Sequence, residues 1–372
     1  MRVLLDATSL PALRLGAGQY VAELARALDR RGDLALSILA KDSDERAVRE
    51  IAPGADIRTT RVRSRPARLA WEQAVLPLRA GRMRPHVLHG PHYSLPMAWK
   101  GRSVVTFHDP TFFTHPHLHE RAKVLWFRRM ARTGLRRATV ILAVSDYARA
   151  GAIDRLGAHP DRIRTVHLGV DHSLYCPQKG ASDESLRAAA GVSGPYVLWV
   201  GAQEPRKDVP SLIAAWTRLR EQGLEHRLVL AGPRAWGAAA IDQAVAASPG
   251  ARHVHRPGYV TEVQKIALYR GAAVFVYPSI AEGFGLPVLE AMACGAPVVT
   301  TSGSATSEVG GDAVVAVTAQ DSEALASGIE RALRDAPRLS QAGPVRARQF
   351  SWDRTAEQTV EAYRAAAGEH GG

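Results

Sequence analysis

The chain has 372 residues, 46% of them hydrophobic, and this length predicts two folded domains. Its formal net charge of +12 is unevenly placed, because residues 1–180 carry a net of +14 and residues 181–372 a net of −2. The chain has two cysteines, Cys176 and Cys294, which are far apart in the sequence and argue against a disulfide scaffold. It has no apolar run near the ~20 residues of a spanning helix, which argues against an integral membrane protein. We expect a cytoplasmic protein whose opening residues, with Asp6 in a short apolar run, form a strand instead of a signal peptide.

The N-terminal half predicts alternating strands and helices. A strand at 2–6, a loop with Gly16 and Gly18, and a helix near 19–31 come first, and the helix has apolar residues at helical spacing. Five further strands are expected at 34–40, 86–89, 103–108, 139–144 and 163–166. Helical stretches separate most of them, which is typical of a parallel sheet.

Basic residues of this half gather in two clusters. The first comprises Arg58, Arg61, Arg63, Arg65 and Arg68. The second surrounds Trp126 and Phe127 and comprises Arg121, Lys123, Arg128, Arg129, Arg132, Arg136 and Arg137. Such clusters attract anionic lipid or nucleic acid, and solvated helix faces are the open alternative.

The glycine loop after the first strand does not predict a dinucleotide site. Gly16-Ala17-Gly18 lacks the third glycine of that fingerprint, and the strand at 34–40 is followed by Lys41 instead of an acidic residue.

Half of the chain's 14 histidines lie between residues 86 and 119. His115, His117 and His119 form an H-x-H-x-H run, but it contains Pro116 and no acidic or cysteine partner at a metal-ligand spacing, so we predict a solvated loop and no metal. His108 differs, because it ends the strand at 103–108. A histidine there can hydrogen-bond a sugar hydroxyl or a leaving phosphate, whereas a buried core histidine is the alternative.

The C-terminal half repeats the alternation. A polar segment at 177–194 is interpreted as a hinge, and strands are expected at 196–200, 227–230, 253–255, 274–277, 297–301 and 313–317. A final helix covers 350–367. The fold class is therefore α/β, with two doubly wound domains.

Arg206 and Lys207 follow the strand at 196–200 and precede a helix near 209–221. A basic pair at the carboxyl edge of a parallel sheet can neutralise a diphosphate, since arginine forks two oxygens and lysine adds a point charge.

The stretch SIAEGFGLPVLEAMACGAPVVT, residues 279–300, carries the strongest functional signal. Glu282 and Glu290 stand eight residues apart around Gly283 and Gly285, and a short apolar helix begins near Pro287. The glycines allow a ligand to approach the backbone closely, and the helix presents its positive end. The pattern predicts a phosphate site flanked by two glutamates.

This stretch resembles the E-x7-E signature of retaining, nucleotide-sugar-dependent glycosyltransferases of the GT-B fold, the "glycosyl transferases group 1" family. The segment GAQEPRK resembles the family's G-x-x-x-x-R-K element, and TFHDP its strand-end His-Asp element. The resemblance covers most of the C-terminal half, and the N-terminal half only through short elements.

The resemblance implies two Rossmann-like domains that face each other across a cleft. Residues 1–176 would bind the acceptor, 177–194 form the hinge and 195–350 bind the donor, while a helix at 351–369 packs back on the first domain. Of the implied catalytic residues, Arg206 and Lys207 hold the diphosphate and His108 lies near the transferred sugar. Glu282 is a further implied catalytic residue, and Glu290 is implied to bind the ribose. The implied donor-binding residues, besides Arg206 and Lys207, are Gly16, Gly18, Glu282, Gly283, Phe284, Gly285 and Glu290.

We therefore expect transfer of a hexose, with retention, from a nucleotide-diphosphate sugar to a glycan, glycolipid or lipid-linked acceptor. GDP-mannose is the first expectation for the donor, and UDP-glucose and UDP-N-acetylglucosamine share the signature. No cofactor is expected. Asp42 and Asp44 match the D-x-D of metal-dependent transferases, but they lie in a polar stretch typical of a helix N-cap.

Two alternatives from other classes remain. One is a nucleotide-sugar epimerase of the same fold, which would act on the donor alone. The other is a nucleic-acid-binding protein, favoured by the net charge, although no reader motif accompanies the basic clusters. We expect no nucleic-acid partner, and an anionic membrane surface as a peripheral docking site.

Overall fold

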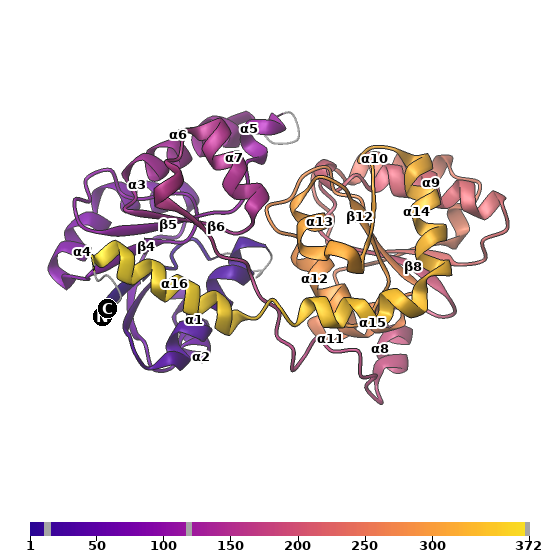
Figure 1. The fold of residues 1–372 in the computed structure, drawn as a ribbon, viewed down its shortest axis with the longest axis horizontal. Helices are drawn as coiled ribbons and strands as arrows, with labels where there is room; N and C mark the ends of the chain where they lie inside the picture. Colours follow the sequence, from indigo (N-terminus) through magenta and orange to yellow (C-terminus); the bar gives the residue numbers. More distant parts are fainter. Residues whose placement is uncertain (11–15, 117–120, 369–372) are drawn as a thin grey trace. The chain divides into compact units, whose positions relative to one another are not determined.

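The structure, a computed structural model, describes residues 1–10, 16–116 and 121–368. The chain forms two α/β units (Figure 1), one comprising Met1–Gly169 with Ser351–Gly372 and the other Val170–Phe350.

The N-terminal unit contains a parallel sheet in the order β3-β2-β1-β4-β5-β6-β7. Its strands are β1 (Arg2–Asp6), β2 (Ala35–Lys41), β3 (Asp56–Thr60), β4 (Val87–Gly90), β5 (Ser103–Phe107), β6 (Val140–Ala143) and β7 (Ile163–Thr165). β4, β5 and β6 are buried along their whole length, as expected of central parallel strands.

Helices connect these strands, and the last helix of the chain returns to this unit. They are α1 (Ala17–Arg31), α2 (Glu45–Ile51), α3 (Arg65–Ala74), α4 (Leu76–Met83), α5 (Thr111–Thr114), α6 (Arg121–Arg137), α7 (Asp146–Leu156) and α16 (Trp352–Ala367). α16 packs against α1 and the central strands, and Tyr363 on it shares a 2.6 Å hydrogen bond with His89 of β4.

The C-terminal unit contains a parallel sheet in the order β10-β9-β8-β11-β12-β13. Its strands are β8 (Tyr196–Val200), β9 (Arg227–Ala231), β10 (Val254–Gly258), β11 (Val274–Tyr277), β12 (Val298–Thr301) and β13 (Val315–Val317). Its helices are α8 (Asp183–Ala189), α9 (Val209–Glu221), α10 (Ala238–Ala247), α11 (Glu262–Gly271), α12 (Leu286–Ala293), α13 (Ala305–Gly310), α14 (Ser322–Arg334) and α15 (Ala336–Ala347).

Each sheet changes winding direction beside its first strand. β1 lies between β2 and β4, and β8 lies between β9 and β11, so consecutive connections leave these strands in opposite directions. Ligands of doubly wound sheets bind at the carboxyl end of such a switch point. In the C-terminal unit the switch point lies between the loops that follow β8 and β11.

The predicted strands at 2–6, 196–200 and 274–277 have the observed bounds. β3 was not predicted, because Asp56 and Arg58 give it a polar face at the sheet edge, where it pairs only with β2. The segment 177–194, interpreted as a hinge, lies inside the C-terminal unit. There α8 packs on α11, and Arg270 donates to the Cys176 carbonyl at 2.8 Å and contacts Asp183 at 3.3 Å.

The chain leaves the N-terminal unit at Gly169 and re-enters it at Ser351. A Cβ on Gly169 would lie 2.2 Å from the carbonyl carbon of Ser351, so the two crossing segments approach more closely than any side chain would permit.

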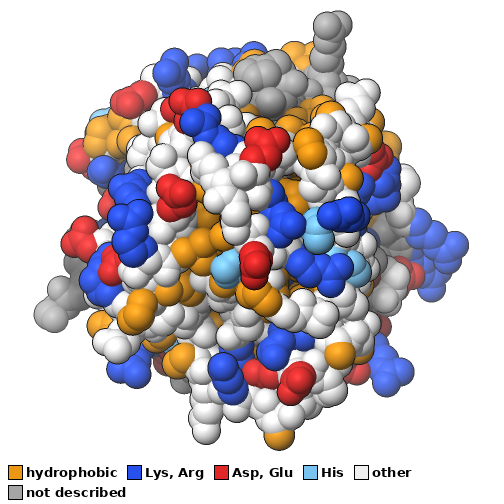
Figure 2. Space-filling view, turned by 90° about the vertical axis from the view of Figure 1, so that its right-hand side faces the viewer, with side chains coloured by type: hydrophobic (Ala, Val, Ile, Leu, Met, Phe, Trp, Pro, Cys, Tyr) orange, Lys and Arg blue, Asp and Glu red, His pale blue; other side chains and the backbone are white. Residues whose placement is uncertain are grey.

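No helix in the described ranges is long and apolar enough to cross a membrane. Figure 2, which faces the right-hand side of Figure 1, shows acidic and basic side chains interspersed over that face.

Candidate functional site

Two loops of the C-terminal unit are joined at the switch point of its sheet. The loop after β8 ends in a short 3-10 turn, Pro205–Lys207, and the loop after β11 contains Ser279 and Glu282. The carbonyl of Arg206 accepts hydrogen bonds from Ile280 N–H at 2.9 Å and from Ser279 Oγ at 3.0 Å. The two loops are therefore tied together by their own hydrogen bonds.

Glu282 is the centre of this site, and its side chain is 11% exposed. Its Oε1 lies 2.7 Å from Arg206 Nη1 and accepts hydrogen bonds from Ser279 Oγ at 2.6 Å and from Lys207 Nζ. Tyr277 donates to the same oxygen at 3.2 Å. All of these contacts end on Oε1, so in the described chain Oε2 keeps its acceptor capacity for a ligand.

The buried charges of this cluster shift one another's pKa values. Burial opposes ionisation of Glu282, but Arg206 and Lys207 outweigh it and hold the pKa of Glu282 well below its usual range. Burial and the neighbouring Arg206 lower the pKa of Lys207, against the opposing effect of Glu282. For Arg206, burial is outweighed by Glu282 and Glu204, which raise its pKa, and Glu204 pairs with it at 2.8 Å.

Helix α12 directs its N-terminus to the end of this loop. Its N-cap is Gly285, with φ +101° and no capping side chain, and a Cβ there would lie 2.6 Å from Thr306 Cγ2. No acidic residue occupies the first turn, so the positive end of the helix is not neutralised locally. The helix ends in a Schellman motif: Gly295, at φ +78°, donates to Met292 O and Ala296 donates to Ala291 O.

Glu290 lies on α12 and is 2% exposed. Lys265 Nζ lies 3.1 Å from its Oε2, and Tyr269 donates to the same oxygen at 3.2 Å. Lys265 also contacts Glu262 at 3.2 Å, and these two carboxylates raise the pKa of Lys265 although its burial lowers it.

Phe284, predicted with its neighbouring glycines to bind the donor, is 3% exposed and packs on Phe350 with ring centroids 5.9 Å apart. Its side chain belongs to the core, so the backbone of 283–285 is the part of the segment that can meet a ligand.

The other predicted site residues lie in the N-terminal unit. Gly16 is the N-cap of α1 at φ +54°, and Gly18 lines a cavity of this unit. His108 follows β5, is 8% exposed, and donates through Nε2 to the Pro91 carbonyl at 2.7 Å. Burial lowers the pKa of His108, which favours a neutral ring with Nδ1 as acceptor. Tyr20 packs edge-on against it at 5.0 Å.

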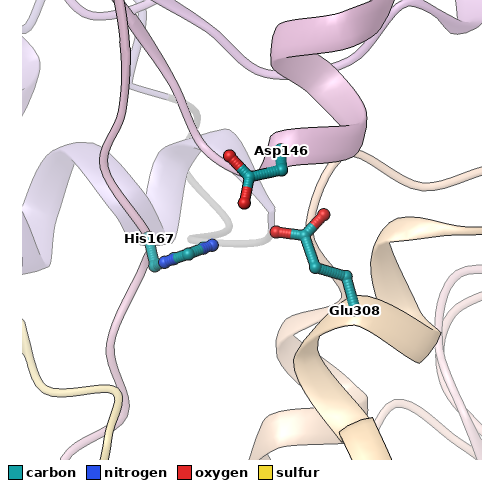
Figure 3. A group of neighbouring side chains, drawn as sticks. All are labelled: Asp146, His167 and Glu308. Carbon is teal, nitrogen blue, oxygen red and sulfur yellow. The ribbon is translucent and has the colours of Figure 1, made fainter.

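Three side chains that could together hold a metal ion, Asp146, His167 and Glu308, come from two different units. Asp146 and His167 both belong to the N-terminal unit and point toward one another (Figure 3), and Asp146 accepts from Thr165 Oγ1 at 2.5 Å. Glu308, also drawn there, belongs to α13 of the other unit. His117 and His119 of the H-x-H-x-H run lie outside the described residues.

Sequence reasoning missed the residues that hold the two glutamates. Around Glu282 these are Tyr277 and Ser279, and around Glu290 they are Lys265 and Tyr269. Glu204, which pairs with Arg206, was missed as well. The spacing of Lys265 and Tyr269 could have indicated that they act together, because residues four apart share a face of a helix such as α11.

Models of two glycosyltransferase families match this chain, one in each unit. Residues 194–335 match the model of "Glycosyl transferases group 1", and residues 15–174 match that of "Glycosyltransferase Family 4". An O-antigen chain mannosyltransferase B of Escherichia coli is 35% identical over 75% of this chain and 74% of that protein. An MMP alpha-(1->4)-mannosyltransferase of Mycolicibacterium hassiacum is 30% identical over 70% of this chain and 64% of its own length.

The fold is similar to that of the sucrose-phosphate synthase of Thermosynechococcus elongatus. The TM-score is 0.81 at 22% identity, over 99% of this chain and all of the other.

Proposed function

Because the chain belongs to the glycosyl transferases group 1 family, we propose that it transfers a hexose, with retention, from a nucleotide-diphosphate sugar to an acceptor hydroxyl. The observation that carries this proposal is the cluster of Arg206, Lys207 and Glu282 at the switch point of the C-terminal sheet. The cluster lies beside the N-terminus of α12, which has no capping side chain.

The cluster suits a departing diphosphate. As the bond between the anomeric carbon and the phosphate oxygen breaks, negative charge grows on the diphosphate. Preorganised cations and a helix N-terminus stabilise that charge in a site with little water. Since Glu282 already holds both cations in place, little reorganisation is needed when the charge develops.

Retention follows from attack on the face that the leaving group vacates. The acceptor oxygen bonds to the anomeric carbon, the old carbon–oxygen bond breaks, and the acceptor proton passes to a leaving phosphate oxygen. Oε2 of Glu282 and the 283–285 backbone hold hydroxyls of the donor sugar, and Glu290 accepts from the ribose. The resemblance to the family assigns Gly16 and Gly18 to the donor phosphates. His108, with Nδ1 as acceptor, holds a hydroxyl of the transferred sugar.

For the donor we propose GDP-mannose; the names of the two mannosyltransferase relatives support the sugar, and the donor panel below tests the nucleotide. For the acceptor we propose a glycan or lipid-linked glycan, with the protein acting in the cytoplasm, at the inner face of the membrane. We expect preorganised donors from Arg206 and Lys207, together with the N-terminus of α12, to stabilise the diphosphate without a metal, so activity should survive excess EDTA. A strict Mg²⁺ or Mn²⁺ requirement would overturn this part.

A donor panel tests the proposal. GDP-mannose, UDP-glucose and UDP-N-acetylglucosamine are compared for the rise they cause in melting temperature, since a ligand that binds only the folded state stabilises it. GDP-mannose is expected to give the largest rise. A larger rise with a uridine donor would replace GDP-mannose, and no rise with any donor would contradict the transferase proposal. Conversion of a bound donor without transfer would favour the epimerase alternative.

A further inference from the structure

A cavity of about 450 Å³ lies within the N-terminal unit, at the carboxyl end of its sheet. Its wall includes Thr8 after β1, Lys41 at the end of β2 and Tyr93 after β4. All of its lining residues belong to this unit, and it occupies the sheet's own switch point, beside β1 and β4.

Four cationic side chains line this cavity: Lys41, Arg63, Arg65 and Arg68. Two of them are already paired, since Lys41 lies 3.0 Å from Asp44 and Arg68 lies 2.8 Å from the buried Glu72. Arg65 lies over the ring of Phe127 at 5.4 Å. Within the described ranges no carboxylate pairs with Arg63 or Arg65, so the cavity keeps uncompensated positive charge.

Two helices add to this charge because both begin at the cavity. Ala17 and Gly18 of the first turn of α1 line it, as do Ser64 and Arg65 at the start of α3. Neither first turn contains an acidic residue. The start of α1 holds Gly18, which is assigned above to the donor phosphates. The acceptor phosphate is therefore assigned to the positive end of α3, a helix of 10 residues, and to the arginines beside it.

His92 is the residue of the remaining wall that can meet sugar hydroxyls. It packs edge-on at 5.7 Å against Phe127, whose ring is already covered by the guanidinium of Arg65 and by the stacked ring of Phe112 at 4.4 Å. Burial, followed by His108, Arg68 and Arg65, lowers the pKa of His92 well below its ordinary value, so its neutral ring can both donate to and accept from hydroxyls. Thr8 and Ser94 also line this wall, and Thr8 Oγ1 already donates to Asp6 at 2.6 Å.

We propose that this cavity binds the acceptor through a phosphate group carried by the sugar to be extended, with Arg63 and Arg65 as the residues that select it. Arginine suits this role because its guanidinium forks two phosphate oxygens. The inference rests on the proposed transferase function, and it adds an anionic acceptor class. The same phosphate chemistry is present in a free sugar phosphate and in the headgroup of a lipid-linked sugar.

The test uses the full chain with its donor site saturated by the nucleoside diphosphate that the donor panel selects. Binding of mannose 1-phosphate and of neutral methyl α-mannoside is measured by saturation-transfer NMR. A third arm uses a farnesyl-diphosphate-linked mannose in detergent. Arg63→Ala is compared with Arg61→Ala, because Arg61 is exposed in the same loop but does not line the cavity.

The phosphorylated sugar is expected to bind more tightly than the neutral one. Arg63→Ala should weaken it about ten-fold, as loss of one charged hydrogen bond implies, while Arg61→Ala leaves it unchanged. Tighter binding of the farnesyl compound would assign the phosphate to a lipid headgroup, and tighter binding of mannose 1-phosphate to a free sugar phosphate.

Equal affinity for the two water-soluble sugars would overturn the inference, as would equal losses in both variants. Mannose 1-phosphate is also titrated into the nucleotide-free protein. Binding that is seen only without the nucleotide would also overturn the inference, because the phosphate would then be bound in the donor site. Nucleotide binding is recorded in the same samples. If it persists while the sugar phosphate fails to bind, the transferase proposal stands and only the anionic acceptor is lost.

Discussion

The guanidinium of Arg206 lies 2.7 Å from the carboxylate of Glu282, and Lys207 donates to the same oxygen. With Glu204 on the other side of Arg206, the cluster holds two positive and two negative charges. It is therefore neutral before a donor binds. The cations that we assign to the diphosphate are held by an internal carboxylate, which fixes their positions in advance.

Lys207→Ala should lower kcat/KM by about 10²-fold or more, since one preorganised cation facing the leaving group is lost. Arg206 still neutralises Glu282 in this variant, so the free energy of unfolding should fall by only about 1–3 kcal/mol. Steady-state kinetics and chemical denaturation measure the two effects. Lys179→Ala, an exposed lysine of the same unit, is the control and should be silent. Near wild-type turnover in Lys207→Ala would remove this residue from the site.

Glu290→Ala should weaken donor binding about ten-fold or more, because a charged acceptor for the ribose hydroxyls is lost. Calorimetric titration with the nucleoside diphosphate measures this, and Glu330→Ala, exposed on α14, is the matched control. Since Lys265 pairs with Glu290 at 3.1 Å, Lys265→Met should reproduce part of the loss by releasing the carboxylate. Unchanged nucleotide affinity in Glu290→Ala would contradict the ribose assignment.

Gly285→Ala should reduce both stability and donor affinity. The residue stands at φ +101°, and its new Cβ would lie 2.6 Å from Thr306 Cγ2, so α12 has to shift. Gly223 has the same φ of +101° with open space around it, which makes Gly223→Ala a control for backbone strain alone. That strain costs about 1–3 kcal/mol in either variant, and only Gly285→Ala should show the larger loss of thermal stability together with weaker donor binding. Equal losses would mean that the contact with Thr306 is unimportant.

Much of the fold could be predicted because its strands are short apolar runs between helical stretches. β8 and β11 are continuously buried, and their bounds followed from composition alone. β3 could not be found in this way, since an exposed edge strand carries polar residues that resemble a loop. The segment 177–194 looked like a linker because of its glycines and prolines, whereas contacts with α11, distant in sequence, hold it within the C-terminal unit.

The site was only partly predictable. Glycine spacing and flanking strands located Glu282 and the Arg206–Lys207 pair on two loops. The sheet order then brings these loops together, which a one-dimensional pattern cannot specify. Two contacts depend on side-chain geometry between distant segments of the chain. One oxygen of Glu282 contacts both cations, and Lys265 pairs with Glu290.

Stability of the N-terminal unit should fall in mild acid because of His89. Burial, together with His108, lowers the pKa of His89 to about 3, and the ring shares hydrogen bonds with Tyr363 at 2.6 Å and Thr106 at 2.9 Å. A folded pKa below the unfolded value of about 6.5 means that this stability is complete above that pH and is lost as the pH falls toward 3. The loss should reach about 1.4 kcal/mol per pH unit. His89→Gln should flatten the pH dependence of unfolding, and exposed His159→Gln should not. An unchanged slope in His89→Gln would contradict this account.

The basic cluster on α6 is the surface that we expect to contact an anionic membrane. Arg128 and Arg132 lie over the ring of Phe113 at 5.6 and 5.3 Å, and Arg137 donates to the Trp99 carbonyl at 3.2 Å. These three arginines therefore have structural roles as well as their charge. Arg129 and Arg136 are exposed, and so is Leu125, at 76%. These exposed side chains are available to an anionic surface.

We expect the protein to sediment with phosphatidylglycerol vesicles at low salt and not with neutral vesicles. Each basic residue near an anionic surface contributes about 1 kcal/mol, so Arg129→Glu with Arg136→Glu should release most of the bound protein. Binding should also weaken as salt rises, because the Debye length falls to about 10 Å at 0.1 M. Arg46→Glu with Arg49→Glu, on the exposed face of α2, is the matched control, since both arginines already pair with glutamates of their own helix. If the wild-type protein stays in the supernatant at low salt, peripheral docking is wrong, and the clusters are solvated helix faces.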